Sequence, residues 1–269
     1  MKFSVLMSVY YKADANQLRE ALTSIWDEQT CRPDQVVLVE DGPLPNEVKQ
    51  VIASFQQKLG DKLLTPKFEK NQGLARALNL GLQHCSFEWV ARMDADDISL
   101  PDRFANQLNF LHMHPDIAVL GTQVSEWDES MMREISKKRL PTAHHDLRAF
   151  ISWRCPMNHP TVIFRKAAIL SVGGYPDTYP EDWLLWGKLL VSNYKIANLS
   201  TIDVKMRMEN ACFDRRGLSF LWGELQTLRN FHQMGLMSTF VLIRNSILRL
   251  FLRTAPRRLR QYFYKQFRQ

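Results

Sequence analysis

The chain has 269 residues, of which 45% are hydrophobic and 23% are charged, and this composition excludes a disordered or fibrous protein. A chain of this length folds as one large α/β domain or as two small ones. Its four cysteines are far apart and form no CxxC pair, so we expect neither a zinc module nor a disulfide framework, and a reducing compartment is favoured. No uncharged apolar run reaches the roughly 18 residues that an ordinary membrane-spanning helix needs.

The positive charge is concentrated at the C-terminal end. The chain carries 35 Lys and Arg against 28 Asp and Glu, a formal net charge of +7. Residues 225–269 hold nine of the basic residues and no acidic ones, which leaves 26 basic against 28 acidic residues, a net −2, in residues 1–224. The partner of this segment is therefore expected to be anionic, either a membrane surface or a nucleic acid.

Strands and helices are expected to alternate over the first hundred residues. Apolar runs predict strands at 3–9, 35–39, 62–68 and 87–93, and helical spacing predicts helices at 14–28, 47–59 and 73–84. This alternation predicts an α/β fold with a mainly parallel, Rossmann-like sheet flanked by helices. Ligands of such sheets bind beyond the carboxyl ends of the strands, where this chain places Tyr10, Asp41 and the segment 94–97.

The rest of the chain shows shorter elements. Helices are expected from Pro101 to about His114, with the proline at the first helical position, and at 142–151, 166–172 and 181–191. Strands are expected at 117–124, 161–165, 195–199 and 203–208, with a strand or loop at 130–140. We expect a catalytic domain over 1–215, followed by a helical, basic C-terminal tail over 216–269.

Asp94, Asp96 and Asp97 form the sharpest chemical feature of the sequence. Three carboxylates in four residues repel one another, and a divalent cation offsets this repulsion. Mg²⁺ or Mn²⁺ takes one or two carboxylates together with diphosphate oxygens. The alternative is a solvated turn in which Asp96 or Asp97 caps the next helix, although Ser99 or Leu100 is better placed for that cap.

Four further polar residues have both a functional and a structural interpretation. Asp41 can accept hydrogen bonds from a base or ribose, or can belong to a turn before Gly-Pro. Asn71 can cap the helix that follows it, and Arg76 can pair with a phosphate or with an acidic neighbour. His159 is favoured as a buried structural histidine rather than as a substrate ligand.

The start of the predicted helix 181–191 carries a second acidic group. Glu181 and Asp182 suit the dipole of a helix N-terminus, or provide a rigidly held carboxylate base. Trp183 beside them would offer an aromatic surface on which a sugar stacks. Gly173 and Gly174 allow the backbone to approach a ligand closely.

These motifs together resemble glycosyltransferase family 2, whose members are inverting enzymes with a GT-A fold, and the similarity is greatest to bacterial transferases of exopolysaccharide, O-antigen or lipopolysaccharide synthesis. The resemblance runs from Phe3 to about Arg216. It rests on SVYYKAD in the first loop, Glu-Asp-Gly at 40–42, NQGLARALN at 71–79, ARMDADDISLPDRFANQ at 91–107, HPTVIFRKAAILSVGGY at 159–175, EDWLLW at 181–186 and Met-Arg-Met at 206–208.

The resemblance implies a UDP-sugar donor and a role for each motif. Tyr10 would stack on the base, although the family often has Asn after this tyrosine and this chain has a second tyrosine. Asp41 would contact the uracil or ribose, and Asp94 the ribose or sugar. Asp96 would bind the metal, with Asp97 beside it, and Arg207 would contact the diphosphate. Asp182 would be the general base. Residues 173–175 would face the donor sugar and the acceptor. Residues 1–100 would form the nucleotide-sugar-binding half and 101–215 the acceptor-binding half.

The C-terminal tail contains a strongly apolar segment, 237–252, which is interrupted by Arg244 and Arg249. Its apolar, arginine and aromatic residues favour a helix that lies on an anionic membrane surface, with a lipid-linked saccharide as acceptor. The alternative is a helix that packs on the body of the protein. We therefore expect a cytoplasmic protein bound peripherally to the inner face of the cell membrane, and no nucleic-acid partner, because the body is net acidic.

Two other classes remain as alternatives at this point. A nucleotidyltransferase or nucleotide-sugar pyrophosphorylase also combines a nucleotide-binding sheet with acidic metal ligands, but the loop after the first strand lacks the glycines that such enzymes need. A non-catalytic polyanion-binding protein would act through the basic tail alone.

Overall fold

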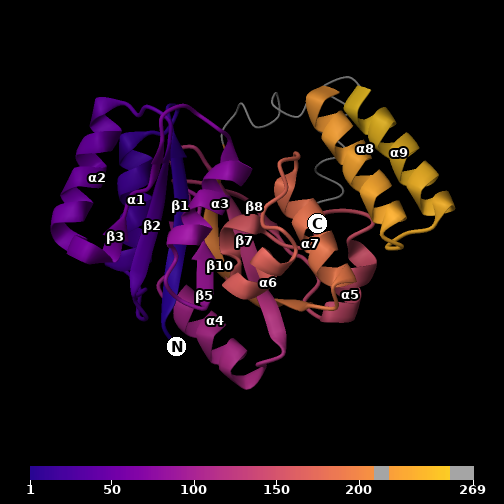
Figure 1. The fold of residues 1–269 in the computed structure, drawn as a ribbon, viewed down its shortest axis with the longest axis horizontal. Coiled ribbons are helices and arrows are strands. Elements are labelled where there is room, and N and C mark those ends of the chain that lie inside the picture. The colour runs from indigo at the N-terminus through magenta and orange to yellow at the C-terminus, as the bar shows by residue number, and fades with distance from the viewer. Residues whose placement is uncertain (209–217, 255–269) are drawn as a thin grey trace.

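The computed structural model describes residues 1–208 and 218–254 of the chain. Its strands belong to one sheet (Figure 1). They are β1 (Phe3–Tyr10), β2 (Gln35–Asp41), β3 (Leu63–Leu64), β4 (Lys67–Phe68), β5 (Trp89–Arg92), β6 (Ile98–Ser99), β7 (Ile117–Asp128), β8 (Glu134–Lys138), β9 (Ile163–Arg165) and β10 (Lys195–Met208).

The sheet is mixed, with the order β3-β2-β1-β5-β9-β7-β10-β6, while β4 pairs with β2 and β8 with β7. β1 runs parallel to β2 and β5, and β7 runs parallel to β10. β9 is antiparallel to both of its neighbours, and β6 is antiparallel to β10. The predicted parallel half is therefore confirmed, and one short antiparallel strand joins it to the second half. The two strands expected at 195–199 and 203–208 are one strand, because register shifts around 198–204 accommodate the intervening residues without ending the pairing.

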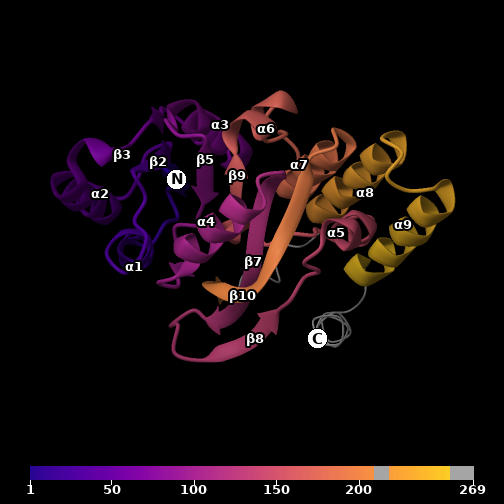
Figure 2. The ribbon, with the colours of Figure 1, turned by 90° about the horizontal axis from the view of Figure 1, so that it is seen from below.

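Helices cover both faces of the sheet (Figure 2). The core on one face includes side chains of α1 (Ala15–Trp26), α2 (Asn46–Leu59) and α4 (Arg103–Met113). The core on the other face includes side chains of α3 (Leu74–His84), α5 (His144–Phe150), α6 (Lys166–Ser171) and α7 (Glu181–Val191). Short 3₁₀ helices lie at Gly60–Lys62 and His159–Thr161. In α1 the residues Leu18, Leu22 and Ile25, at helical spacing, are fully or almost fully buried, as the pattern predicts.

The start of α4 differs from the prediction. The helix begins at Arg103, and Pro101 and Asp102 form the turn before it. The Thr30 backbone N–H donates to the Pro101 carbonyl at 3.0 Å and the Thr30 hydroxyl donates to the Asp102 carboxylate at 3.0 Å, so this turn is tied to another loop. Ser99, an expected cap, lies in β6 instead.

Two further helices, α8 (Leu218–Gln233) and α9 (Thr239–Thr254), lie side by side beyond α7 (Figures 1 and 2). α8 packs closely on α7: a Cβ added at Gly187 of α7 would lie only 2.2 Å from the ring of Phe231 of α8. The predicted helical tail is thus seen for 218–254, where it packs on the body, and its last residues, 255–269, lie outside the described residues. Within the two described ranges, no helix is long and apolar enough to cross a bilayer.

Candidate active site

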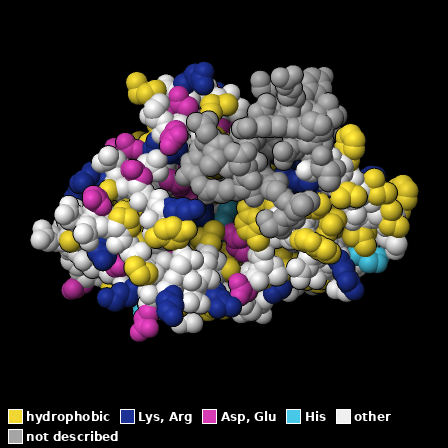
Figure 3. Space-filling view, turned by 90° about the horizontal axis from the view of Figure 1, so that it is seen from above, with side chains coloured by type: hydrophobic (Ala, Val, Ile, Leu, Met, Phe, Trp, Pro, Cys, Tyr) yellow, Lys and Arg dark blue, Asp and Glu magenta, His cyan; other side chains and the backbone are white. Residues whose placement is uncertain are grey.

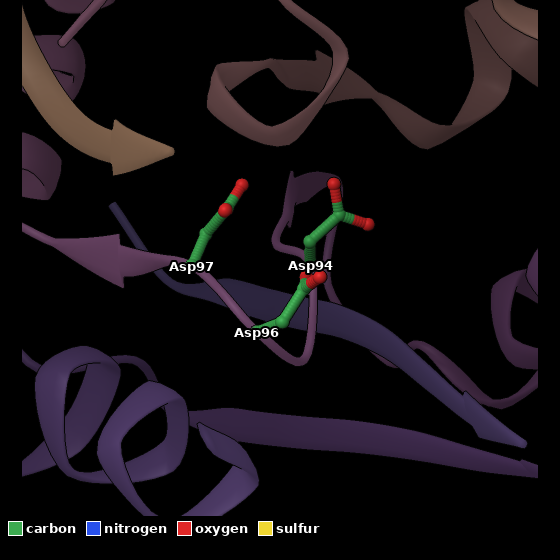
Figure 4. Close-up of side chains that lie close together, drawn as sticks. All are labelled: Asp94, Asp96 and Asp97. Atoms are coloured by element: carbon green, nitrogen blue, oxygen red, sulfur yellow. The ribbon is translucent and has the colours of Figure 1, made fainter. Parts of the chain in front are cut away.

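Asp94, Asp96 and Asp97 lie on the turn between β5 and β6, and ligand atoms of the three carboxylates lie within 4.8 Å of one another (Figure 4). Asp97 is only 2% exposed. One of its oxygens accepts the Arg207 backbone N–H at 2.8 Å, and the other, Oδ2, is buried with no hydrogen-bond partner among the described residues. Burial raises the pKa of Asp97 well above its usual value, and the charges of Asp96 and Asp94 raise it further. A converging carboxylate cluster with an oxygen left unsatisfied fits a divalent cation such as Mg²⁺ or Mn²⁺.

Arg207, near the end of β10, holds this acidic turn in place. Its guanidinium donates to the Asp96 carbonyl at 2.9 Å, to the Glu20 carboxylate at 2.6 Å and to the Glu129 carbonyl. The side chain is nearly buried by these contacts. A contact between Arg207 and a diphosphate stays a prediction, and the observed contacts give the residue a positioning role.

Arg92, the last residue of β5, was not among the predicted site residues. Its guanidinium forms an ion pair with Asp94, is 2% exposed, and leaves Nε and Nη1 without a hydrogen-bond partner in the described part of the chain. Burial opposes its charge, but Asp94, followed by smaller contributions from Tyr175 and Asp97, outweighs burial and raises the pKa of Arg92. The signal in the sequence was a basic residue at the end of an otherwise buried strand, directly before the acidic cluster.

Glu181 and Asp182 form the first turn of α7. Asp182 accepts the Trp183 backbone N–H at 2.8 Å and the Cys155 thiol at 3.2 Å. Burial raises the pKa of Asp182, and the Cys155 hydrogen bond lowers it in part. Burial, followed by the charge of Asp182, raises the pKa of Glu181 to about 7. The pair can therefore hold a proton close to neutral pH, which is the property that a general base needs.

Charged side chains connect the two acidic groups. The charge of Arg92 lowers the pKa of both Glu181 and Asp182, and the charge of Asp94 raises that of Glu181. The structure therefore brings together the predicted base and the predicted metal ligands around one buried guanidinium. Cys155 is a second residue that the sequence prediction missed, since a cysteine 27 positions before Asp182 gives no local signal.

His159 lies beside this centre and is buried. Its Nε2 is 3.1 Å from the Tyr175 hydroxyl, and its ring makes an edge contact with Trp186. Burial, with a contribution from Arg92, lowers the pKa of His159 well below its usual value, so that the ring is neutral. The preferred interpretation of His159 as a structural residue is confirmed.

Asp41 and Asn71 contact each other at the end of β2. Both carboxylate oxygens of Asp41 accept hydrogen bonds, from the Gln72 N–H at 2.6 Å, from the Gly73 N–H at 2.9 Å and from Asn71 Nδ2 at 3.0 Å. The side chain of Asn71 therefore does not cap α3 itself. It donates to Asp41, whose carboxylate accepts the backbone N–H groups just before α3. Tyr10 is the register partner of Asp41 in the sheet, so both expected nucleotide contacts lie at one edge.

Two of the remaining predicted residues, Arg76 and Gly174, contact other parts of the protein in this structure. Arg76 forms an exposed ion pair with Asp177 at 2.6 Å. Gly173 and Gly174 have positive φ. A Cβ at Gly174 would lie 2.4 Å from Asn79 Oδ1, so the close approach there is to the protein itself, whereas a Cβ at Gly173 would meet no described atom within 4 Å.

The expectation of a stacking surface at Trp183 is wrong. The ring is 2% exposed, its Nε1 donates to the Ile151 carbonyl at 2.9 Å, and it packs edge-on against Phe231. Because its helix is covered by α8, the side chain belongs to the core and not to a sugar-binding surface.

Comparison with known proteins identifies the class to which this fold and site belong. The model of Glycosyl transferase family 2 matches residues 4–172, and the chain belongs to this family of glycosyltransferases. The chain is 35% identical over 99% of its length to the amylovoran biosynthesis glycosyltransferase AmsE of Erwinia amylovora, of which it covers 99%. It is 36% identical over 98% of its length to the UDP-Gal:alpha-D-GlcNAc-diphosphoundecaprenol beta-1,3-galactosyltransferase of Escherichia coli, of which it covers 96%.

Solved structures show the same GT-A fold. The S. aureus TarS fragment 1–349 in complex with UDP-GlcNAc superposes with a TM-score of 0.69 at 20% identity, over 93% of this chain and 73% of that one. In another S. aureus TarS structure this chain spans 44% of the TarS chain. The predicted family, enzyme class and GT-A fold are thus confirmed, and the two alternatives, a nucleotidyltransferase and a non-catalytic polyanion-binding protein, are set aside.

Proposed function

We propose that this enzyme transfers a sugar from a UDP-sugar to a hydroxyl group of a lipid-linked saccharide, with inversion, in the synthesis of a bacterial surface polysaccharide. The observation that carries the proposal is the division of the site into two acidic groups, one suited to a cation and one suited to a proton. The proposal is also supported by the Escherichia coli relative, whose name states a UDP-linked donor and a diphosphoundecaprenol-linked acceptor.

In this reaction Asp182 acts as the general base. It takes the proton of the acceptor hydroxyl while that oxygen forms a bond to the anomeric carbon, and the bond from this carbon to the diphosphate oxygen breaks with its electron pair leaving on UDP. Proton removal by a positioned base contributes typically ~10²–10⁴-fold to the rate. The N–H of Trp183 and the thiol of Cys155 fix the orientation of the Asp182 carboxylate. Glu181 and Arg92 set the charge around it.

Donor binding would use the edge formed by β1, β2 and β5. Tyr10 and Asp41 would contact the nucleoside, and Asp94 the ribose or sugar. A Mg²⁺ or Mn²⁺ ion held by Asp96 and Asp97 would offset the charge of the diphosphate. Peripheral contact of the C-terminal tail with an anionic membrane surface would keep the enzyme close to a lipid-linked acceptor.

The decisive experiment is calorimetry of UDP binding with and without Mn²⁺. Wild type should bind UDP in a metal-dependent manner, and Asp96→Ala should abolish that dependence, whereas Asp61→Ala, an exposed carboxylate outside the site, should bind like wild type. Asp182→Asn should bind UDP normally and lose turnover. Metal-independent binding in the wild type, or full activity of Asp182→Asn, would refute the assignment.

A further inference from the structure

α9 is oriented with its apolar side toward solvent. Five large apolar residues recur along one side of it, each 51–73% exposed, and these define the outer face: Phe240, Ile243, Ile247, Leu250 and Phe251. Trp222 of the neighbouring helix α8 is 75% exposed. Figure 3 shows hydrophobic side chains gathered over this end of the molecule.

Two of the arginines of α9, Arg249 and Arg253, face the body of the protein, whereas Arg244 is exposed. Arg249 and Arg253 both pair with Glu224, which is 4% exposed, and Arg253 Nε lies 2.9 Å from that carboxylate. Their guanidinium groups also lie over the rings of Trp183 and Phe220, at 4.6 and 4.4 Å from the ring centroids. A helix that only covered the core would bury its apolar side and hydrate its arginines, so packing alone does not explain the outer face.

The charge around the outer face identifies the kind of partner it fits. Glu224 is the only acidic residue from 218 to the end of the chain, and it is buried and paired. Arg229 and Arg244 are exposed beside the apolar residues. The sequence of 255–269 adds five basic residues, four aromatic ones and no acidic one. Apolar side chains flanked by cations are typical of a helix that lies in the interface of an anionic bilayer.

We propose that the outer face of α9, together with Trp222, inserts among the lipids of an anionic membrane surface as an apolar contact. This refines the proposed role of the tail: Arg249 and Arg253 are paired with Glu224 inside the protein, Arg244 stays exposed at the edge of the outer face, and the insertion is made by the apolar residues. A groove of about 530 Å³ between α8 and α9 continues the surface, with Leu225, Leu242 and Ile243 in its lining.

The contact would also connect the membrane with the catalytic base. α8 lies directly on the loop before Glu181, since a Cβ at Gly223 would be 1.6 Å from the Tyr179 carbonyl oxygen. Arg249 of α9 lies over Trp183, the residue that follows Asp182. The membrane contact itself does not depend on the proposed function. The further inference that this geometry presents the base to a lipid-linked acceptor does rest on it.

The test is flotation of the full-length protein with lipid vesicles of phosphatidylcholine alone and of phosphatidylcholine mixed with phosphatidylglycerol. The wild type should float with the anionic vesicles and stay bound in high salt, because an apolar contact is not screened. Ile247→Asp and Phe240→Asp should each lower the partition coefficient by roughly tenfold or more, given the contribution of one buried large side chain. Ile135→Asp, at an apolar residue of β8 that is 51% exposed, should float like the wild type.

Two results would overturn the proposal. If Ile247→Asp floats like the Ile135→Asp control, the outer face is not the contact; loss of all binding in high salt would then assign binding to the basic segment 255–269. If the wild type binds neither vesicle and is a dimer that Ile247→Asp dissociates, the outer face joins two copies of the chain. UDP calorimetry on each variant shows that it is folded and keeps a failure of this proposal separate from a failure of the donor site.

Discussion

Replacing Glu181 by glutamine should stabilise the protein at alkaline pH, although Glu181 lies in the proposed active site. The pKa of this carboxyl is raised from 4.5 in its ordinary state to about 7 in the fold. Between these two pH values the folded chain holds a proton that the unfolded chain has lost, so the free energy of unfolding falls as the pH rises. A difference of 2.5 pKa units corresponds to about 3 kcal/mol when both states are ionised. The glutamine side chain is neutral throughout and escapes this loss.

The measurement is urea unfolding of wild type and Glu181→Gln at pH 5 and at pH 8. We expect the variant to be more stable by about 1 kcal/mol at pH 5 and by about 3 kcal/mol at pH 8, with an unchanged dependence on urea. Glu47→Gln is the matched control, because Glu47 occupies the first turn of α2 but is exposed, and it should show little pH-dependent gain. An equal gain at both pH values, or a loss at pH 8, would refute the assignment of a buried, proton-holding Glu181.

Two further predictions concern the surroundings of the base. Cys155→Ala removes the thiol that donates to Asp182 and lowers its pKa, so the acidic limb of the pH profile of kcat/KM should move to higher pH, while Cys155→Ser should restore the wild-type profile. An unshifted limb would mean that the thiol does not orient the base. Gly223→Ala places a Cβ against the Tyr179 carbonyl and should destabilise the fold by roughly 1–3 kcal/mol in thermal unfolding, whereas Gln226→Ala, on an exposed position of α8, should be close to neutral. Equal stabilities of these two α8 variants would contradict the close packing.

Local pattern was sufficient for most of the sheet and for the acidic turn. Strands such as β1 and β2 are mostly buried and rich in apolar residues, and the acidic turn 94–97 comes shortly after another buried strand, β5, so each could be predicted from adjacent residues. The position of the short strand β9 could be predicted from the sequence, but its antiparallel direction could not. Its pairing with β5 and β7 is determined by the fold and not by its own three residues.

Contacts between distant segments account for what the sequence did not predict. The partners of Asp182 and Asp41 include Cys155 and the Gln72 backbone, and neither pairing leaves a local pattern. The side of α9 that faces inward is likewise decided by another helix. Arg249 and Arg253 lie one helical turn apart, and because both pair with Glu224 on α8, this side of α9 faces the protein.

The unequal burial of the two acidic groups would allow one site to meet the two demands of the proposed function. Asp94 and Asp96 are half-buried on a turn, beside the unsatisfied oxygen of Asp97, so a partly hydrated cation can be accommodated there. Glu181 is buried at the start of a helix, where burial favours a proton over a charge. Desolvation of the Glu181–Asp182 pair therefore has two effects. It lowers the stability of the fold, and it raises the pKa of Glu181 to about 7, near the pH at which a base for a sugar hydroxyl would have to work.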